Sequence, residues 1–198
     1  MSAKRNLRRL FSAGFARIPA GAAADTQRAA VSVVANLPLA QAWAYLSDFS
    51  LPHNYVPGIT RTEIVSDQVS GVGAHRLVHD AGGDYLEETI IDWREGEGFI
   101  IRLHHGDRPM APFQRAEFSY QLSPAGPDAC LVQLSLTFVM PWGGFGATLG
   151  EWFILPAMEK RLVQVAAGMK HFYETGTAAT DEDRERLAAV VEIAPAAE

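Results

Sequence analysis

The sequence predicts an α+β domain in which a curved, seven-stranded antiparallel sheet wraps around one long C-terminal helix. The first observation is the run from 145 to 174, where apolar residues recur at alternating steps of three and four, as on one side of a helix. These residues are Leu155, Met158, Leu162, Val165, Met169 and Phe172. The second is a series of preceding segments that alternate apolar and polar residues, which is typical of half-buried strands. The third is the short glycine-containing turns between those segments, which favour antiparallel neighbours.

Length and composition indicate one domain with two tails. The chain has 198 residues, of which 48% are hydrophobic, enough for a sizeable single core. We expect an N-terminal arm at residues 1–25, the folded domain at residues 26–175, and an acidic, alanine-rich tail at residues 176–198.

Charge is divided unevenly along the chain. The formal net charge is −6, and residues 1–24 contain five basic residues and no acidic one, so the remainder carries −11. A domain this acidic repels a nucleic-acid backbone, which excludes nucleic acid as its expected partner. The single cysteine, Cys130, excludes an internal disulfide and fits a reducing compartment. We expect a cytoplasmic protein, with contact at a membrane surface as an alternative.

The N-terminal arm leaves three interpretations open. Its apolar residues lie at helical spacing beside the basic ones, until Pro19 stops the pattern. They are Leu7, Leu10, Phe11, Phe15 and Ile18. A basic amphipathic helix of this kind suits an anionic membrane surface. The same composition is typical of a targeting segment, and a disordered basic tail is the third interpretation.

The domain begins with a strand, two short helical pieces and a second strand. Residues 27–35 alternate as a strand does. Asn36 then stands two residues before Pro38, and proline is well tolerated in the first turn of a helix. A bend ending at Gly58 leads into the second strand at 59–66.

Five further strands and the long helix complete the prediction. The strands are expected at 74–79, 85–93, 99–105, 116–122 and 132–140. The last two alternate most clearly, so one face of the sheet is apolar and needs a cover, which the long helix supplies. Pro156 lies inside this helix and is expected to kink it, leaving residues 145–155 free to move as a lid.

Particular residues, in this order of elements, carry a family resemblance. They are Leu37-Pro38, Ala42-Trp43, Leu46-Ser47-Asp48-Phe49, Tyr55-Val56-Pro57-Gly58-Ile59, Gly71-Val72-Gly73-Ala74-His75-Arg76, Glu88 with Asp92, and Gly106 with Pro109. Across residues 26–174 the chain resembles the START-like (SRPBCC) superfamily, in its polyketide cyclase/dehydrase and lipid-transport group. The resemblance implies a helix-grip fold with an apolar cavity between sheet and helix that takes a lipid, a quinone or a polyketide-like molecule. Such relatives include both carriers and aromatase/cyclases, so the fold alone does not carry an activity.

The six histidines do not suggest a metal site from their spacing. His75 and His79 are four residues apart on one strand, about 13 Å at about 3.3 Å per residue, which is too far to share an ion. His104 and His105 are adjacent on a strand and point to opposite faces. We therefore expect no metal ligands and no cofactor. Arg102 and His104 are expected to face solvent.

Arg76 and Glu88 are the candidates for chemistry. They lie on neighbouring strands joined by the Gly82-Gly83 turn and are expected to pair across them. One alternative is a solvated ion pair with no further role. The other is a buried pair that orients a carbonyl or hydroxyl of a ligand and, in a cyclase, polarises a ketone or accepts a proton.

Three functions remain open. The first is binding or transport of a hydrophobic small molecule, because apolar walls with few polar groups are typical of a binding pocket. The predicted walls are Trp43, Tyr55, Tyr85, Phe118, Tyr120, Phe138, Met158, Leu162 and Met169. The second is an aromatase/cyclase or dehydratase that uses Arg76 or Glu88. The third is a membrane-peripheral or protein-interaction module docked by the arm; the oligomeric state is not constrained.

Overall fold

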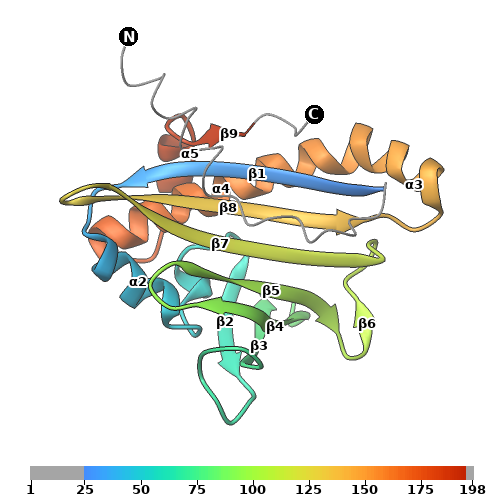
Figure 1. Ribbon diagram of the computed structural model, residues 1–198, viewed down its shortest axis with the longest axis horizontal. Helices are drawn as coiled ribbons and strands as arrows, with labels where there is room; N and C mark the ends of the chain where they lie inside the picture. Colours follow the sequence, from blue (N-terminus) through green and yellow to red (C-terminus); the bar gives the residue numbers. More distant parts are fainter. Residues whose placement is uncertain (1–24, 195–198) are drawn as a thin grey trace.

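The computed structural model describes residues 25–194 and has the predicted arrangement of one sheet around one long helix (Figure 1). The strands are β1 (Thr26–Ala35), β2 (Ile59–Ile64), β3 (His75–Asp80), β4 (Tyr85–Arg94), β5 (Gly98–His105), β6 (Arg108–Pro109), β7 (Arg115–Gly126), β8 (Ala129–Val139) and β9 (Glu192–Ile193). They pair in the order β2-β3-β4-β5-β7-β8-β1-β9, and β6 pairs with β5. Every pairing is antiparallel.

The predicted count of seven strands is wrong: the described residues form nine. The two additional strands are β6 and β9, of two residues each. An alternating pattern needs at least four residues to stand out from chance, so strands this short leave no readable trace in the sequence.

The helices are α2 (Leu39–Ser47), the 3-10 turn η1 (Pro52–Asn54), α3 (Gly143–Leu149), the π-helical turn η2 (Gly150–Ile154), α4 (Leu155–Thr175) and α5 (Asp181–Ala188). Between β1 and β2 lie α2 and η1, as predicted. No helix among residues 25–194 is both long and apolar enough to cross a membrane.

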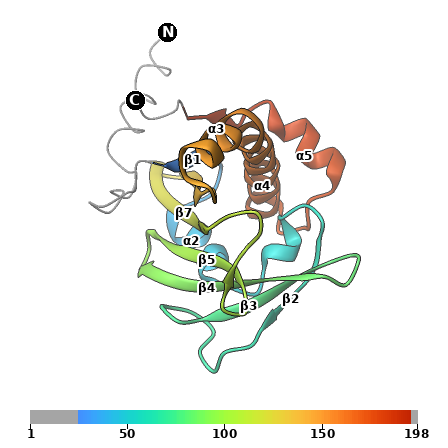
Figure 2. The same ribbon diagram turned by 90° about the vertical axis from the view of Figure 1, so that its right-hand side faces the viewer.

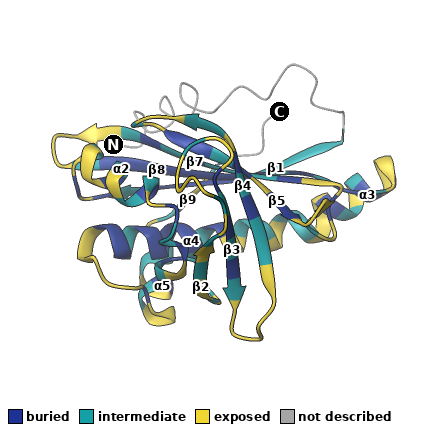
Figure 3. Ribbon diagram, turned by 90° about the horizontal axis from the view of Figure 1, so that it is seen from below, coloured by how far each residue is buried: buried dark blue, intermediate teal, exposed yellow. Residues whose placement is uncertain are grey.

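The apolar stripe of α4 packs against the concave side of the sheet (Figure 2). Leu162, Val165, Met169 and Phe172 are all buried. The middle of this helix is buried or partly buried, and its exposed residues lie toward its ends (Figure 3). Gly168 allows a close approach, because a Cβ there would lie 2.2 Å from the Tyr55 carbonyl oxygen. The helix is therefore fixed firmly along its second half.

The first half of the long helix contains the irregular turn η2 just before Pro156. Proline lacks an N–H and its ring collides with the carbonyl four residues earlier, and a wider π turn removes that collision. The end of α3 is attached to the sheet, because the Gln27 side chain donates a hydrogen bond to the Ala147 carbonyl. Movement of residues 145–155 as a lid stays a prediction.

The residues that follow α4 continue the packed structure. Helix α5 lies against α4, and its first turn is closed by a reciprocal cap between Thr180 and Asp183. The Ala179 N–H donates to the Asn54 carbonyl at 2.8 Å, and β9 pairs with β1. Residues 176–194 therefore do not stand apart from the domain. The arm at residues 1–24 lies outside the described residues.

Candidate functional site

An apolar cavity of about 250 Å³ lies between α4, η1 and the inner face of the sheet. Its walls come from every layer of the fold, because alternate residues of β3, β4, β5, β7 and β8 point inward. The lining residues are Pro52, Val56, Ile59, Val78, Leu86, Glu88, Leu103, Met110, Phe118, Tyr120, Leu136, Met158, Arg161, Leu162 and Val165. Most of this surface is apolar, so the cavity suits a molecule that water solvates poorly.

The volume limits the size of the occupant. An apolar protein cavity of about 150 Å³ takes up benzene, and pockets for drug-sized ligands span about 300–1,000 Å³. A space of about 250 Å³ lies between these two cases. In this conformation the cavity fits a compact molecule of one or two rings, or one end of a longer one.

Glu88 and Tyr120 form a polar end in this mostly apolar wall, and Arg76 lies directly behind them. The Arg76 side chain is 1% exposed. Its Nε donates to Glu88 Oε2 at 2.6 Å, and its Nη1 donates to the Phe49 carbonyl at 2.7 Å. The guanidinium carbon also lies 3.8 Å from the centre of the Phe49 ring. Pairing of Arg76 with Glu88 is confirmed, in its buried form.

Burial keeps the nearby tyrosines protonated. It raises the pKa of Tyr55 to about 12, against a smaller opposing effect of the Arg76 charge. Burial also raises the pKa of Tyr120 well above its usual value of 10.0, and the negative charge of Glu88 adds to this. The cavity wall therefore presents a neutral hydroxyl at Tyr120, able to donate a hydrogen bond, beside the ion-paired carboxylate of Glu88, able to accept one.

Arg161 closes one side of the cavity. Its guanidinium donates to the Pro57 carbonyl, which ties α4 to the turn between η1 and β2. Burial lowers the pKa of Arg161, and the charge of Arg184 lowers it further. The remaining hydrogen-bonding capacity of this side chain is available at the cavity wall.

Four of the nine residues predicted to form the walls line the cavity. They are Phe118, Tyr120, Met158 and Leu162. Phe138 and Met169 point inward but are buried in the core away from the cavity. Tyr55 is buried between η1 and α4, where its ring packs against Phe172 and Tyr173.

The other two predicted wall residues lie elsewhere. Trp43 packs edge-on against Trp93 and donates from Nε1 to Glu95 at 2.9 Å. Tyr85 is 42% exposed, and its ring packs at a tilt against that of His105, with 4.8 Å between the ring centres. It shares strand parity with the outward-facing Glu87, so its ring points away from the cavity.

Sequence reasoning missed several wall residues. Two of them could have been predicted from the strand pattern. Leu86 lies two residues from the inward-facing Glu88 on the same strand, and Leu103 lies directly opposite Glu88 on β5, so both side chains point inward. Met110 lies in the connection between β6 and β7, and Arg161 is a charged residue beside the apolar stripe of α4. Neither has a sequence pattern that assigns it to a cavity.

A second group of polar side chains lies on the opposite, outer face of the same strands. His75 from β3, Glu87 from β4 and His104 from β5 bring their ligand atoms within 4.8 Å of one another. Spacing of histidines along single strands does not reveal this group across three strands, and the expectation of no metal ligands stays a prediction. The expected exposure of His104 is wrong, because this residue is 5% exposed.

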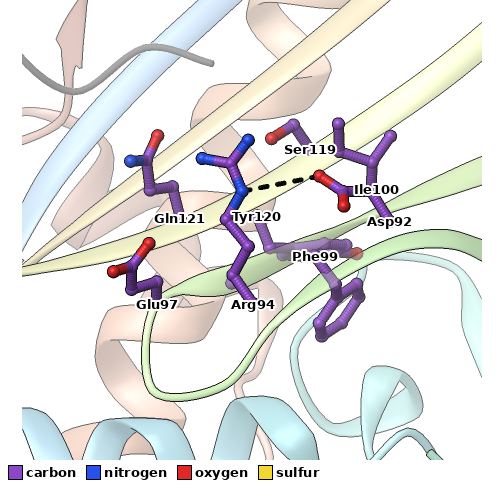
Figure 4. Close-up of a pocket in the computed structure, with 9 residues that line it drawn as sticks. Asp92, Arg94, Glu97, Phe99, Ile100, Ser119, Tyr120 and Gln121 are labelled. Carbon is purple, nitrogen blue, oxygen red and sulfur yellow. Dashed lines mark ion pairs between the residues drawn. The ribbon is translucent and has the colours of Figure 1, made fainter. Parts of the chain in front are cut away.

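A much smaller depression near the start of β5 is not a ligand site. It has a volume of about 20 Å³ and is edged by Asp92, Arg94 and Glu97. Arg94 Nε and Asp92 Oδ2 face each other at 3.6 Å (Figure 4). This volume holds about one water molecule.

Residues 26–170 match the family described as polyketide cyclase/dehydrase and lipid transport. A search of curated protein sequences returned no significant match. Among solved structures, the protein XoxI from Bacillus cereus has 13% sequence identity and a TM-score of 0.59 over 74% of this chain and 95% of that one.

Two other solved structures have the same fold. The protein Ara h 8.0201 has 16% identity and a TM-score of 0.56, over 75% of this chain and 97% of that one. Norcoclaurine synthase from Thalictrum flavum, in complex with dopamine and hydroxybenzaldehyde, has 14% identity and a TM-score of 0.52, over 74% of this chain and 86% of that one. At such identities the likeness concerns the fold alone.

Proposed function

The chain belongs to the polyketide cyclase/dehydrase and lipid-transport family, and from this premise we propose that it binds and carries a compact hydrophobic molecule in the cavity beneath α4. The observation that carries the proposal is the composition of the cavity wall, which is apolar except for the polar end made by Glu88 and Tyr120 and for Arg161 at one side. A ligand that suits it has an apolar body of one or two rings and a hydroxyl or carbonyl group at one end.

Arg76 acts in this proposal as a positioning residue. It is not part of the cavity wall, and its donors serve Glu88 and the Phe49 carbonyl. The ion pair holds the Glu88 carboxylate in one orientation, so the acceptor geometry at the polar end is set before a ligand arrives.

Binding of a matched pair of fluorescent probes tests the proposal. 2-Naphthol and naphthalene differ by one hydroxyl, and a hydrogen bond from that hydroxyl to the Glu88 carboxylate is expected to favour 2-naphthol by about tenfold or more. Glu88→Gln should reduce this preference, and thermal unfolding will show that the variant is folded. Equal affinities of the wild-type protein for both probes would contradict the proposed hydrogen bond between the ligand and the polar end of the cavity.

A cavity-filling variant tests the location. Met158 lines the cavity and Ala157 is exposed on the same turn of α4. Met158→Trp should abolish binding of 2-naphthol, and Ala157→Trp should leave it unchanged. If both variants bind the probe as the wild type does, the ligand does not occupy this cavity. Organic extraction of the purified protein, followed by mass spectrometry, would identify a ligand retained from the cell.

The aromatase/cyclase alternative rests on the same residues. Glu88 and Tyr120 are positioned at the wall, where a carboxylate can accept a proton and a neutral hydroxyl can stabilise an enolate oxygen. If Glu88→Gln and Tyr120→Phe leave turnover of polyketide-like ketones unchanged, this role is excluded. If the wild-type protein turns over no such ketone, binding and transport remains the proposed function.

Delivery at a membrane surface is a second candidate function, supported by four exposed aromatic residues. Trp142, Phe145, Trp152 and Phe153 have exposed fractions between 70% and 74%; we call this group the aromatic tip. It lies at the start of α3, within α3 and in η2, at one end of the molecule (Figure 1). Its last residue, Phe153, stands five residues before the cavity-lining Met158. Exposed aromatic side chains are typical of membrane-interface contacts.

The basic arm joins the domain at the same end. Thr26, the first residue of β1, pairs with Val139, three residues before Trp142. Residues 1–24 carry five positive charges, which attract an anionic lipid surface. The two features together favour docking of this end of the molecule on an anionic membrane.

Vesicle flotation separates the contribution of the aromatic tip to membrane binding from that of the basic arm. The full chain should float with vesicles containing phosphatidylserine, and the double variant Trp152→Ala/Phe153→Ala should float less. A chain beginning at Thr26 should lose the dependence on anionic lipid. Val69→Ala/Val72→Ala, which changes two exposed residues of the β2–β3 connection, is the matched control. Equal flotation of all four proteins would remove the membrane role.

A further inference from the structure

A group of three potential metal ligands lies on the outer face of the sheet, on the side opposite the cavity. His75 is the first residue of β3, Glu87 lies on β4, and His104 lies on β5. Glu87 is directly opposite His104 in the pairing of β4 with β5, and His75 is directly opposite Thr89, two residues further along β4. The register of three strands therefore brings the two imidazoles to either side of one carboxylate.

The distances fit coordination of one ion. His75 Nε2 lies 3.1 Å from Glu87 Oε2, and His104 Nδ1 lies 3.7 Å from the same oxygen. Ligands at about 2.0–2.2 Å from a tetrahedral zinc ion stand about 3.3–3.5 Å apart. Both distances from an imidazole to the carboxylate are therefore close to the tetrahedral value, and the two ring nitrogens lie within 4.8 Å of each other.

In the described part of the chain, His75 Nε2 makes no hydrogen bond that metal binding would break. This nitrogen is buried, and no hydrogen bond of acceptable geometry reaches it from residues 25–194, although Glu87 Oε2 is close. A buried ring nitrogen without a hydrogen bond is costly. Coordination of a metal ion would use its lone pair.

Neighbouring groups hold the other two ligands in orientation. The Gly106 N–H donates to Glu87 Oε1 at 2.6 Å, which leaves Oε2 to face the histidines. His104 Nε2 lies 2.8 Å from the Thr89 hydroxyl. A hydrogen bond from the second ring nitrogen of a metal-binding histidine to an oxygen is the usual supporting contact of such ligands.

The His104 ring also has to give up one contact. Its Nδ1 lies 2.9 Å from the Gly106 carbonyl oxygen, so in this geometry Nδ1 carries the proton and Nε2 accepts from Thr89. Metal binding moves the proton to Nε2, and Thr89 then accepts instead of donating, which a hydroxyl can do. The freed Gly106 carbonyl oxygen is a further possible oxygen ligand.

We propose that His75 Nε2, Glu87 Oε2 and His104 Nδ1 form a binding site for a first-row divalent transition-metal ion such as Zn²⁺. Two imidazoles and one carboxylate match the ligand preferences of these ions. The side chains are 28%, 13% and 6% exposed, respectively, so the site is shielded but reachable. With three protein ligands it keeps a coordination position for water or an oxygen ligand.

Titration of the metal-stripped full chain tests the proposal. Zn²⁺ should bind with one equivalent at high affinity in competition with a chromophoric chelator, and Co²⁺ in its place should give the intense visible absorption of a tetrahedral ion. His75→Ala and His104→Ala should each weaken Zn²⁺ binding by more than about 100-fold, since loss of a supporting contact alone costs about 10–100-fold.

Three controls keep the result specific. His53→Ala removes an exposed histidine in η1 and should leave the affinity unchanged. Thr89→Val should retain the Co²⁺ spectrum but weaken Zn²⁺ binding by about 10–100-fold. Circular dichroism of the metal-free variants will show that they are folded.

Two results would overturn the proposal. The first is no Zn²⁺ or Co²⁺ binding by the wild-type chain, which would make the group a hydrogen-bonded cluster only. The second is equal weakening by His53→Ala and His75→Ala, which would show nonspecific binding to histidines. Either result leaves the naphthol assay of the cavity untouched, so the two proposals fail independently.

Discussion

The two faces of strands β3, β4 and β5 carry different chemistry, although the residues involved are neighbours in the sequence. On the inner face Arg76 and Glu88 form a buried ion pair beside the cavity. On the outer face His75, Glu87 and His104 gather around one carboxylate oxygen. Each inner residue is adjacent along the chain to an outer one, because successive side chains of a strand point to opposite sides.

The two carboxylates differ in the kind of partner that each one contacts. Glu88 faces a permanent cation that is itself almost fully buried, so removal of either partner leaves a charge without compensation. Glu87 faces two imidazoles, whose ring nitrogens can bind a metal ion in place of a proton. The inner group is therefore a fixed element of the wall, and the outer group is suited to reversible binding.

The largest expected effect comes from breaking the inner pair. Arg76→Met leaves the Glu88 carboxylate buried and unpaired, and should lower the free energy of unfolding by about 3–5 kcal/mol. Urea denaturation at pH 7 measures this change. On the outer face, Glu87→Gln should lower it by only about 1 kcal/mol or less, because the amide oxygen still accepts from Gly106.

The double variant Arg76→Met/Glu88→Met sharpens the same comparison. Replacing both charges by apolar side chains of similar length removes the unpaired charge, so the loss of stability should be much smaller than for Arg76→Met alone. A double variant as unstable as the single one would mean that packing of Arg76 on Phe49, and not the charge pair, maintains this part of the fold.

A smaller effect is expected at alkaline pH for the buried Tyr55, which lies on the cavity side of the sheet between η1 and α4, and not for the exposed Tyr85 on the outer side. The pKa of Tyr55 is about 12 because of burial, against an ordinary value of 10.0. The hydroxyl therefore stabilises the fold fully below pH 10, and this contribution, about 2–3 kcal/mol, disappears as the pH rises toward 12. Tyr55→Phe should flatten the decline in unfolding free energy over this range. Tyr85→Phe, at an exposed outer position, should leave the decline as it is in the wild type.

Much of the fold and part of the cavity were predictable from local patterns. Strand alternation assigned Phe118 and Tyr120 to the inner face, and the helical stripe assigned Met158 and Leu162 to the buried side of α4. The same patterns do not separate cavity from core. Met169 lies on the same stripe as Met158 but further along the helix, where sheet and helix meet without a gap, and that position depends on how the sheet curves.

The group of His75, Glu87 and His104 on the outer face could not be predicted from local patterns alone. Its members come from three strands, so their proximity depends on strand register, which is a nonlocal property. The predicted pairing of Arg76 with Glu88 nevertheless contained the necessary signal. Once these two residues face each other on the inner side, their neighbours His75 and Glu87 must both point outward. His104 then follows from the pairing of β4 with β5.

The smallest expected effect compares two threonine–histidine contacts that differ in burial. The Thr89 hydroxyl lies 2.8 Å from Nε2 of the buried His104, and the Thr62 hydroxyl lies 3.3 Å from Nδ1 of the exposed His53. In metal-free protein, Thr89→Val should lower the free energy of unfolding by about 1–2 kcal/mol, because it leaves a buried ring nitrogen without its partner. Thr62→Val should change it by less than about 0.5 kcal/mol, since water replaces the lost contact. Equal effects in urea denaturation would mean that water reaches His104, and that the outer group is less shielded than its side-chain exposure indicates.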